Sequence, residues 1–498
     1  MSIIKETGIF FKENVILFTI ILFAACLRFP GLFHGLPVYP DADEPFIISI
    51  AVRIFKGQWN PHFFHYPSLC FYLNAALIGV THVVYHTLHF LGVTSSPSTP
   101  YWMFFAAGRI ASALLSLAAV WLVYRIGCLV FSRRMGFYSM VIMALMPILY
   151  TYSVNVAPNA LLVVAALSSI YYSMKYLVMN KDNHLYLAAL CAGLALGAKY
   201  MFPVPLSFLI AKYFVDRKYG NKFIDIRLLS SVVLVGVTFI ITTPALLFSF
   251  QEWIGDILFE HRHYSSCYAG HGFDNAFLFY LQYLFLEGIT PLVFICSIVG
   301  MVVFFRRKKE ELAVLCIVPL VWFLFCSMYS LTSVRNIALI SVVFAVGAGI
   351  ALDSIPKLWI RYLLLLFLVT VPLVKDIQQI LLYRKPDIRC LVEEWINENL
   401  PRGSVIAREE YTPYYSEERF ESIYIGICGL AFMTPDSVRN LGCDYVISAG
   451  YERFERDPEM FPENVENIRK HKKEFAVIKI FDPGTRYRGR QQTLFKVK

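Results

Sequence analysis

The chain has 498 residues, of which 57% are hydrophobic and only 16% are charged. Soluble globular proteins carry roughly 25% charged residues, so this composition excludes a soluble globular protein and places most of the chain in lipid. The net charge of +9 does not indicate a nucleic-acid-binding protein, because the lysines and arginines lie between apolar segments, as in the cytoplasmic loops of membrane proteins.

Apolar segments long enough to cross a bilayer, which takes about 20 residues, recur along most of the chain. The basic clusters between them, such as Arg306–Lys309, all fall on one side of the membrane if the N-terminus is cytoplasmic. This pattern predicts eleven spans and an extracytoplasmic C-terminus. The expected spans cover approximately residues 14–33, 103–127, 136–153, 159–178, 184–198, 201–215, 228–247, 288–305, 312–329, 336–353 and 358–376.

The run 66–90 is apolar enough to span the membrane, but counting it as a span would place Arg133–Arg134 outside. Its three histidines, at spacings of four and three, form a polar stripe. We therefore interpret this run as a helix that lies on the outer membrane surface. The stretch 44–57 is expected to form a second surface helix, which makes 34–102 the first extracytoplasmic loop.

The composition changes beyond about residue 384. The segment 386–498 is charged, and helical stretches alternate there with short β-like runs such as CDYVISA. We therefore expect a helical membrane domain at 1–384 and a small extracytoplasmic α/β domain at 385–498. The connection at 248–287 is expected to be the second large extracytoplasmic loop.

Three acids, Asp41, Asp43 and Glu44, lie within four residues shortly after the first apolar segment. Acids at a membrane boundary are costly to hold, so a functional site is the first interpretation. A partly desolvated carboxylate there can take a proton from an incoming nucleophile. The alternative is that Asp43 caps a helix that begins at Glu44 and Pro45, which would explain one acid but not three. Asp43 and Glu44 are adjacent and cannot share one helix face, so we expect two catalytic acids with different tasks.

Three basic residues, Arg28, Lys199 and Arg335, fall on the expected outer side, against the usual charge distribution. An anionic lipid phosphate is their natural partner, because arginine offers a bidentate fork and lysine a point charge. The alternative for each residue alone is that its side chain reaches to ordinary lipid headgroups. We expect the three to form a phosphate site beside the acids.

The outer loop at 248–277 is rich in histidine and contains the sequence EHRHY. Imidazole and carboxylate groups suit divalent metal ions, although the spacing here matches no compact ligand motif. Histidines that only donate and accept hydrogen bonds are the alternative, so no cofactor is certain. Loop or substrate contacts are expected from Asp41, His65, Tyr66, Asn159, Glu260, His263, Tyr264 and His271, with His65 and His263 as the candidate metal ligands.

Several motifs together indicate a family. YPDADEPFII, NPHFFHYPSLCFYL, GLALGAKYMF, ITTPALLF, EHRHY, GHGF and SVRNIAL occur in this order. With them the whole chain resembles the dolichyl-phosphate-mannose-protein mannosyltransferase-like (family thirty-nine) glycosyltransferases, relatives of the lipid A aminoarabinose transferases. The resemblance implies the glycosyltransferase-C fold: an all-α polytopic membrane protein of about eleven transmembrane helices, two surface helices in the first outer loop, and a small α/β extracytoplasmic C-terminal domain.

The resemblance also implies roles for particular residues. The aspartate of the family's Asp-Glu pair falls on Asp43, the expected base, and the residues near the carrier phosphate match Lys199 and Arg335. His65 falls beside the proline-containing segment that Tyr66 begins. Asn159 is a departure, because many family members carry an acid there and an asparagine cannot act as a base.

We therefore expect an inverting glycosyltransferase that moves a sugar from a polyprenyl-phosphate carrier to a lipid, glycan or protein acceptor. The resemblance places it in the inner membrane of a bacterium or archaeon, with the active site and the C-terminal domain outside. One carboxylate can suffice, because a lipid phosphate leaves without protonation at neutral pH. A polytopic transporter or a non-catalytic membrane scaffold with an outer partner-binding domain are the alternatives; a transporter would more often show inverted repeats.

Overall fold

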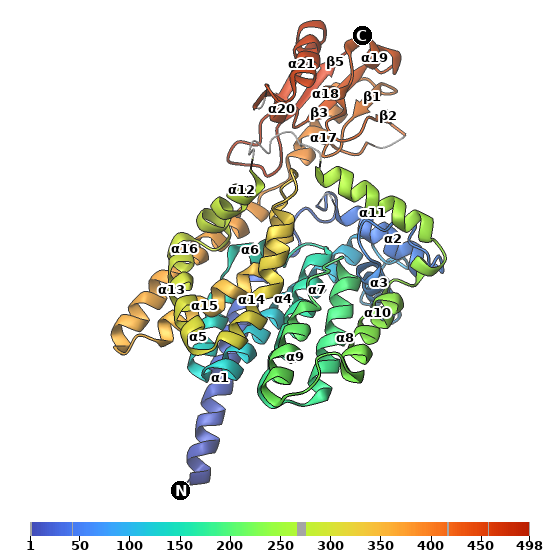
Figure 1. Ribbon diagram of the computed structural model, residues 1–498. Helices are drawn as coiled ribbons and strands as arrows, with labels where there is room; N and C mark the ends of the chain where they lie inside the picture. Colours follow the sequence, from blue (N-terminus) through green and yellow to red (C-terminus); the bar gives the residue numbers. More distant parts are fainter. Residues whose placement is uncertain (1, 42, 266–274, 416–417, 457, 498) are drawn as a thin grey trace. The chain divides into compact units, whose positions relative to one another are not determined.

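The computed structural model describes residues 2–41, 43–265, 275–415, 418–456 and 458–497 (Figure 1). The chain divides into a helical unit (Met1–Phe33, Asp43–Ser266 and Asn275–Ile380) and a C-terminal unit (His34–Ala42, Cys267–Asp274 and Leu381–Lys498). The C-terminal unit therefore begins close to the expected boundary and also includes part of the first loop.

The first half of the helical unit contains α1 (Ser2–Arg28), η1 (Phe29–Gly31), α2 (Glu44–Phe55), α3 (Leu69–Phe90), α4 (Trp102–Val130), α5 (Arg133–Ala144), α6 (Pro147–Thr151), α7 (Pro158–Met179), α8 (Asp182–Ala198), α9 (Leu206–Tyr219) and α10 (Ile226–Thr242). The second half contains η2 (Pro244–Leu247), α11 (Phe250–Ser265), α12 (Ala276–Tyr283), η3 (Leu284–Gly288), α13 (Pro291–Arg307), α14 (Lys309–Cys326), η4 (Val334–Ile340), α15 (Ser341–Asp353) and most of α16 (Leu358–Tyr383).

A helix or helix pair covers each of the eleven expected spans, and the predicted polytopic all-α architecture is confirmed. Within the described residues, six helices are long and apolar enough to cross a membrane, or seven if the pair at 276–288 and 291–307, bent by 110°, is one span. Helix α3 is one of these six helices, so its location on the outer membrane surface remains a prediction. The total of eleven transmembrane spans also remains a prediction.

Local sequence breaks two expected spans and thereby shapes the site. Pro147 begins α6 and divides the span at 136–153, since a proline fits the first turn of a helix but not its interior. Pro158 begins α7 in the same way and places Asn159 at the start of this helix. The span at 336–353 begins as the 3₁₀ turns of η4, which carry Arg335 before the α-helical α15.

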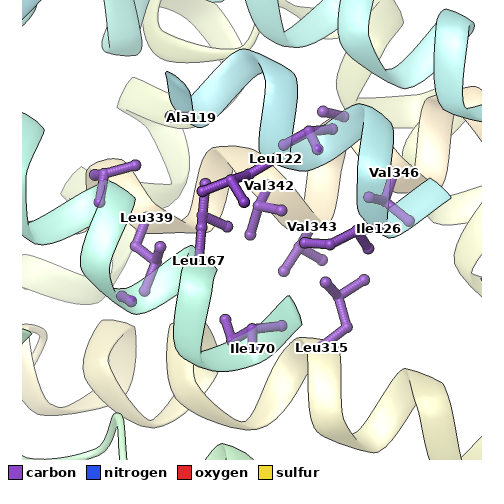
Figure 2. Packing of buried hydrophobic residues seen from close by; sticks show 14 of the residues in the cluster. Ala119, Leu122, Ile126, Leu167, Ile170, Leu315, Leu339, Val342, Val343 and Val346 are labelled. Atoms are coloured by element: carbon purple, nitrogen blue, oxygen red, sulfur yellow. The ribbon is translucent and has the colours of Figure 1, made fainter. Parts of the chain in front are cut away.

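The core of the helical unit is apolar and closely packed. Leu122 and Ile126 of α4, Leu167 of α7, and Val342 and Val346 of α15 are buried together (Figure 2). Glycines allow the closest approach of α13 and α15, because a Cβ on Gly300 would lie 1.8 Å from the carbonyl oxygen of Gly347. Small residues at helix contacts are the usual means of packing helices in lipid. This rigid bundle supports the residues at its ends.

The C-terminal unit is the expected small α/β domain. It contains α17 (Ile388–Asn399), β1 (Val405–Arg408), β2 (Glu421–Tyr424), α18 (Gly429–Phe432), α19 (Pro435–Asn440), β3 (Tyr445–Ala449), α20 (Glu452–Arg456), α21 (Pro462–Glu474), β4 (Ala476–Phe481) and β5 (Gln492–Lys496). The sheet has the order β2-β1-β3-β5-β4; β2, β1 and β3 are parallel, and β5 is antiparallel to both β3 and β4.

Candidate active site

The helical unit contains a cavity of about 440 Å³ that brings together residues from distant parts of the chain. Its polar lining comes from the turn before α2, the 60–66 loop, the start of α7, the end of α8, α11 and η4. The cavity lining includes most of the residues that the sequence singled out, namely Asp43, His65, Tyr66, Asn159, Lys199, Glu260, Tyr264 and Arg335.

Asp43 lies directly before α2 and lines the cavity. Its side chain makes no capping hydrogen bond to that helix; instead its Oδ2 accepts a hydrogen bond from Nη1 of Arg335 on η4. The carboxylate is 44% exposed, so it is open to a ligand in the cavity. Burial and the nearby Asp43 carboxylate raise the pKa of Tyr66, which keeps this phenol a neutral hydrogen-bonding group.

Lys199 follows α8 in extended backbone, outside the helices, and its side chain enters the same cavity. Nζ donates to Oδ1 of Asn336 at 2.6 Å and to Oδ1 of Asn159 at 3.4 Å. Burial and the positive charge of Arg335 lower the pKa of Lys199 to about 8. Since its hydrogen-bond partners are neutral amides, Lys199 supplies positive charge that an anionic ligand can neutralise.

Asn159 and Asn336 therefore position the lysine. Asn159 is buried at the start of α7, and Nδ2 of Asn336 lies 3.4 Å from the hydroxyl of Tyr264. The backbone oxygen of Asn336 accepts a hydrogen bond from the indole of Trp322 at 2.7 Å. The amide of Asn159, which replaces the acid expected in many family members, leaves Lys199 without a competing carboxylate at this position.

The 60–66 loop, which carries His62 and His65, contacts an acidic face of α11. His65 Nδ1 lies 2.7 Å from Glu260 Oε1, and His62 Nδ1 lies 3.1 Å from Glu252 Oε2. Between these pairs, Asp256 Oδ2 accepts a hydrogen bond from the backbone of Phe64 at 2.6 Å. Glu252 and Asp256 are not among the site residues predicted from the sequence. Their spacing of four residues, which continues to Glu260, places three acids on one face of a helix and could have revealed them.

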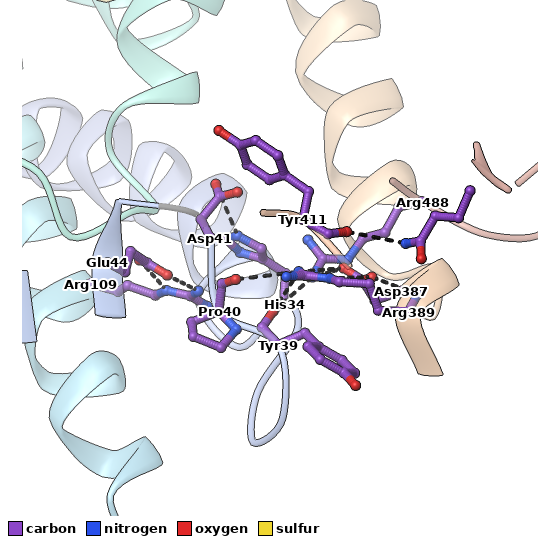
Figure 3. A network of polar contacts seen from close by, with 11 residues as sticks. His34, Tyr39, Pro40, Asp41, Glu44, Arg109, Asp387, Arg389, Tyr411 and Arg488 are labelled. Carbon is purple, nitrogen blue, oxygen red and sulfur yellow. Dashed lines mark hydrogen bonds and ion pairs between the residues drawn. The ribbon is translucent and has the colours of Figure 1, made fainter. Parts of the chain in front are cut away.

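Glu44 lies outside the cavity lining, although it is adjacent to Asp43. It is buried, and its two oxygens accept hydrogen bonds from Nε and Nη2 of Arg109 at 2.8 and 2.5 Å (Figure 3). The backbone N–H of Val156 donates to the same carboxylate at 2.8 Å. These contacts join α2, α4 and the segment before α7, which is a structural task.

Other expected residues also lie elsewhere. Arg28 is buried in the bundle, where it donates to Ser116 Oγ and to the backbone oxygens of Ala24 and Ala144. Asp41 belongs to the C-terminal unit, 3.8 Å from His34 (Figure 3). His263 is on α11 but does not line the cavity, and His271 lies outside the described residues.

The possible metal ion remains a prediction. Within the described ranges, no group of three or more histidine, cysteine, aspartate and glutamate side chains is arranged to hold a metal ion. His65 is paired with Glu260, whereas His263 packs against the rings of Phe259 and Tyr264. The two candidate ligands thus have different neighbours.

The buried pair predicts a stability effect that separates Glu44 from Asp43. Glu44→Gln removes the carboxylate charge that pairs with the buried Arg109, which should destabilise the protein by about 3–5 kcal/mol. Thermal unfolding in detergent should show a clear loss, and the double variant Glu44→Gln/Arg109→Met should be less destabilised than Glu44→Gln alone. Normal unfolding with loss of activity in Glu44→Gln would instead assign Glu44 to the reaction.

Comparisons with known proteins agree with this architecture. A family model described as dolichyl-phosphate-mannose-protein mannosyltransferase matches residues 103–248. Comparison with curated protein sequences finds no significant match. ArnT from Cupriavidus metallidurans in the apo state is similar over 99% of this chain and 98% of its own, with a TM-score of 0.57 and 12% sequence identity.

A second solved structure, the archaeal oligosaccharyltransferase AglB from Archaeoglobus fulgidus in complex with an inhibitory peptide and a dolichol-phosphate, is similar over 96% of this chain and 74% of its own. The TM-score is 0.55 and the identity 13%. At such low identities these likenesses show the fold. The region matched by the family model runs from α4 to the end of η2 and includes Asn159 and Lys199 of the cavity.

The fold and the family model together confirm the relationship that the motifs predicted. The chain is therefore a multi-pass membrane protein of the glycosyltransferase-C fold, in which residues 103–248 match the dolichyl-phosphate-mannose-protein mannosyltransferase family.

Proposed function

We propose that the protein transfers a sugar from a polyprenyl-phosphate carrier to an acceptor at the outer face of the membrane. The observation that carries this proposal is one cavity that joins an accessible carboxylate, Asp43, to two cations, Lys199 and Arg335. In such a site the carboxylate can accept a proton while the two cations bind an anionic leaving group. ArnT of Cupriavidus metallidurans, which has the same fold, was solved bound to undecaprenyl phosphate, which supports a lipid-phosphate donor.

The two cations are suited to different parts of a phosphate group. Arg335 presents a planar fork, and Lys199 is a compact charge held by two amides. Arg335 is paired with Asp43 in this structure, so an arriving phosphate would compete for the guanidinium. Binding of the donor then leaves the Asp43 carboxylate available to the acceptor.

The rest of the cavity is apolar, as a polyprenyl chain requires. Phe202, Trp322, Phe325, Tyr329 and Leu331 line it beside the cations. These side chains come from α14 and from the segments that precede α9 and η4. We place the first isoprenyl units of the carrier against them, because an apolar chain that leaves the bilayer needs a lining as apolar as the lipid.

The reaction is a single displacement with inversion. The acceptor hydroxyl gives its proton to Asp43 while its oxygen forms a bond to the anomeric carbon of the sugar. The bond between that carbon and the phosphate oxygen breaks, and its electron pair stays on the departing polyprenyl phosphate. Lys199 and Arg335 stabilise the negative charge that develops there. Tyr66 and His65 are positioned to orient the sugar or the acceptor.

A donor screen tests the function. The protein in liposomes is given polyprenyl phosphates carrying different hexoses and pentoses, and release of free polyprenyl phosphate is measured. Release with at least one donor, dependent on the acceptor, is expected. A chelator arm tests the divalent ion predicted beside His65. Absence of release with every donor and acceptor from native protein, in membranes that support a known transferase, would contradict the proposal.

The lowered pKa of Lys199 predicts the pH dependence of donor use. Lys199 loses its charge as the pH rises through about 8, so kcat/KM for the donor should fall above that pH, by up to about tenfold per pH unit. Lys199→Arg keeps its charge at all these pH values and should move the fall to higher pH. Superimposable pH profiles of the two proteins would remove Lys199 from the phosphate site.

A further inference from the structure

The C-terminal unit carries a cluster of polar groups that the transfer reaction does not use. In its sheet the parallel strands β2 and β3 flank β1, so the chain leaves β1 toward β2 on one side and leaves β3 toward β4 on the other. In open sheets of this kind, ligands bind outside the carboxyl ends of the strands where the strand order reverses. Here that edge is formed by the residues after Arg408 and after Ala449. Gln492 of β5 pairs with Ala449 and so lies at the same edge.

Two arginines converge on a glycine at this edge. Gly450 has φ of +97°, and a Cβ there would lie 3.5 Å from Nε of Arg453 and 3.6 Å from Nη1 of Arg490. The guanidinium of Arg490 lies 4.0 Å from the centre of the Tyr411 ring. Its Nη1 is buried and has no hydrogen-bond partner among the described residues. A donor with a fixed charge is thus held in place and left unsatisfied.

Two unsatisfied acceptors belong to the same edge. Gln492 is fully buried and donates from Nε2 to the backbone oxygen of Tyr411 at 3.2 Å, while its Oε1 has no partner among the described residues. Glu452, two residues after Gly450, also has one buried oxygen, Oε1, without a described partner. Buried polar atoms are almost always hydrogen-bonded in folded proteins, so such a group of exceptions needs an explanation.

Another buried polar side chain near this edge, Glu409, is fully hydrogen-bonded. This buried carboxylate follows β1 directly and accepts hydrogen bonds from the backbone of Leu430 at 2.9 Å, from Ser448 Oγ at 2.7 Å and from the backbone of Ala449 at 2.7 Å. Burial raises its pKa to about 7. The Glu409 carboxylate therefore has hydrogen-bond partners for both of its oxygens. Arg490, Gln492 and Glu452, in contrast, each have one buried polar atom without a hydrogen-bond partner among the described residues.

We propose that this edge, formed by Tyr411, Gly450, Glu452, Arg453, Arg490 and Gln492, binds an acidic sugar, that is, a sugar with a carboxylate or phosphate group. The paired guanidinium groups suit the anion, which arginine binds with a fork of N–H donors. The unsatisfied oxygens of Gln492 and Glu452 can only accept hydrogen bonds, so they require donors such as sugar hydroxyls. A bare anion would satisfy the arginines but leave both oxygens unpaired.

Two half-exposed tyrosines lie at the carboxyl ends of β1 and β2. Tyr414 and Tyr424 are half exposed, and Arg408, at the carboxyl end of β1, lies 4.4 and 5.4 Å from their ring centres. Such rings offer apolar faces for a sugar ring next to polar partners for its hydroxyls. The inference does not depend on the proposed transfer reaction, because the edge belongs to the C-terminal unit alone.

Binding is measured on the full chain in detergent by saturation-transfer NMR and calorimetry with four probes: glucuronate, glucose 6-phosphate, glucose and inorganic phosphate. The two acidic sugars should bind more tightly than glucose and more tightly than phosphate. Equal binding of glucose would overturn the role of the arginines, and equal binding of phosphate would overturn the role of the sugar. No binding of either acidic sugar at millimolar concentration would overturn the site.

Variants locate the site. Arg490→Gln should weaken binding of glucuronate by about tenfold or more, since a hydrogen bond to a charged group is lost. Arg490→Lys keeps the charge without the fork and should lose less. Arg469→Gln, an exposed arginine on α21, is the matched control and should bind normally. Thermal unfolding identifies variants that fail to fold. Unchanged binding by both folded Arg490 variants would place the ligand elsewhere.

Discussion

Replacing Asp43 with asparagine is expected to lower the rate of sugar transfer by a factor of about 100 or more. Asparagine keeps the size of the side chain but cannot take the proton of the acceptor. Folding should be almost unaffected, because the Asp43 side chain makes no capping hydrogen bond and its ion pair with Arg335 is about half exposed. Exposed pairs of this kind contribute roughly 0–1 kcal/mol. The measurements are single-turnover transfer and thermal unfolding.

Neighbouring acids provide the matched controls. Asp41→Asn should transfer normally, because Asp41 lies in the C-terminal unit beside His34. Glu260→Gln should have an intermediate effect, since it loosens His65 but leaves the proton acceptor. Near-normal transfer by Asp43→Asn together with loss in Glu260→Gln would move the base to Glu260. Normal transfer by all these variants would show that none of these acids is the catalytic base and would contradict the proposed mechanism.

Neutralising Lys199 or Arg335 is expected to produce the second large effect. Lys199→Met and Arg335→Gln should each lower kcat/KM for the donor by about tenfold to several hundredfold, because each removes a charge-assisted contact to the leaving phosphate. Free polyprenyl phosphate should lose affinity as an inhibitor to a similar extent. Arg335→Lys should recover part of the loss, since it restores the charge but not the planar fork.

Arg28 is the comparison residue for these variants. It is a buried arginine of the same unit, but its donors contact Ser116 and two backbone oxygens rather than the cavity. Arg28→Gln should therefore lower thermal stability and leave the donor KM of the folded fraction unchanged. A donor KM that rises in Arg28→Gln as much as in Arg335→Gln would show that general loss of positive charge, rather than contact with phosphate, is responsible.

Much of the architecture could be read from the sequence. The lengths of the apolar segments and the positions of the basic clusters predicted the helical bundle, and the change of composition near residue 384 predicted the α/β domain. The sequence also indicates Asp43, Lys199 and Arg335 as site residues, because charged groups at a membrane boundary are costly to hold without a function. The structure brings these three into one cavity.

The direction of each side chain depended on tertiary contacts. Asp43 and Glu44 are adjacent acids in the sequence, yet one lines the cavity and the other is buried against Arg109. Successive residues on a helix point about 100° apart, and only the packing of α2 on α4 decides which acid points inward. Arg28, expected at the phosphate, is likewise held by carbonyl oxygens inside the bundle.

The partners of the loops were beyond the sequence for the same reason. Glu252 and Glu260 of α11 meet His62 and His65, some 190 residues away in the chain, and Lys199 meets amides on two other helical segments. Periodicity and charge are local properties, so they indicate helices and predict on which side of the membrane each loop lies. A cavity is made by elements that are distant along the chain, and its geometry arises only when those elements pack.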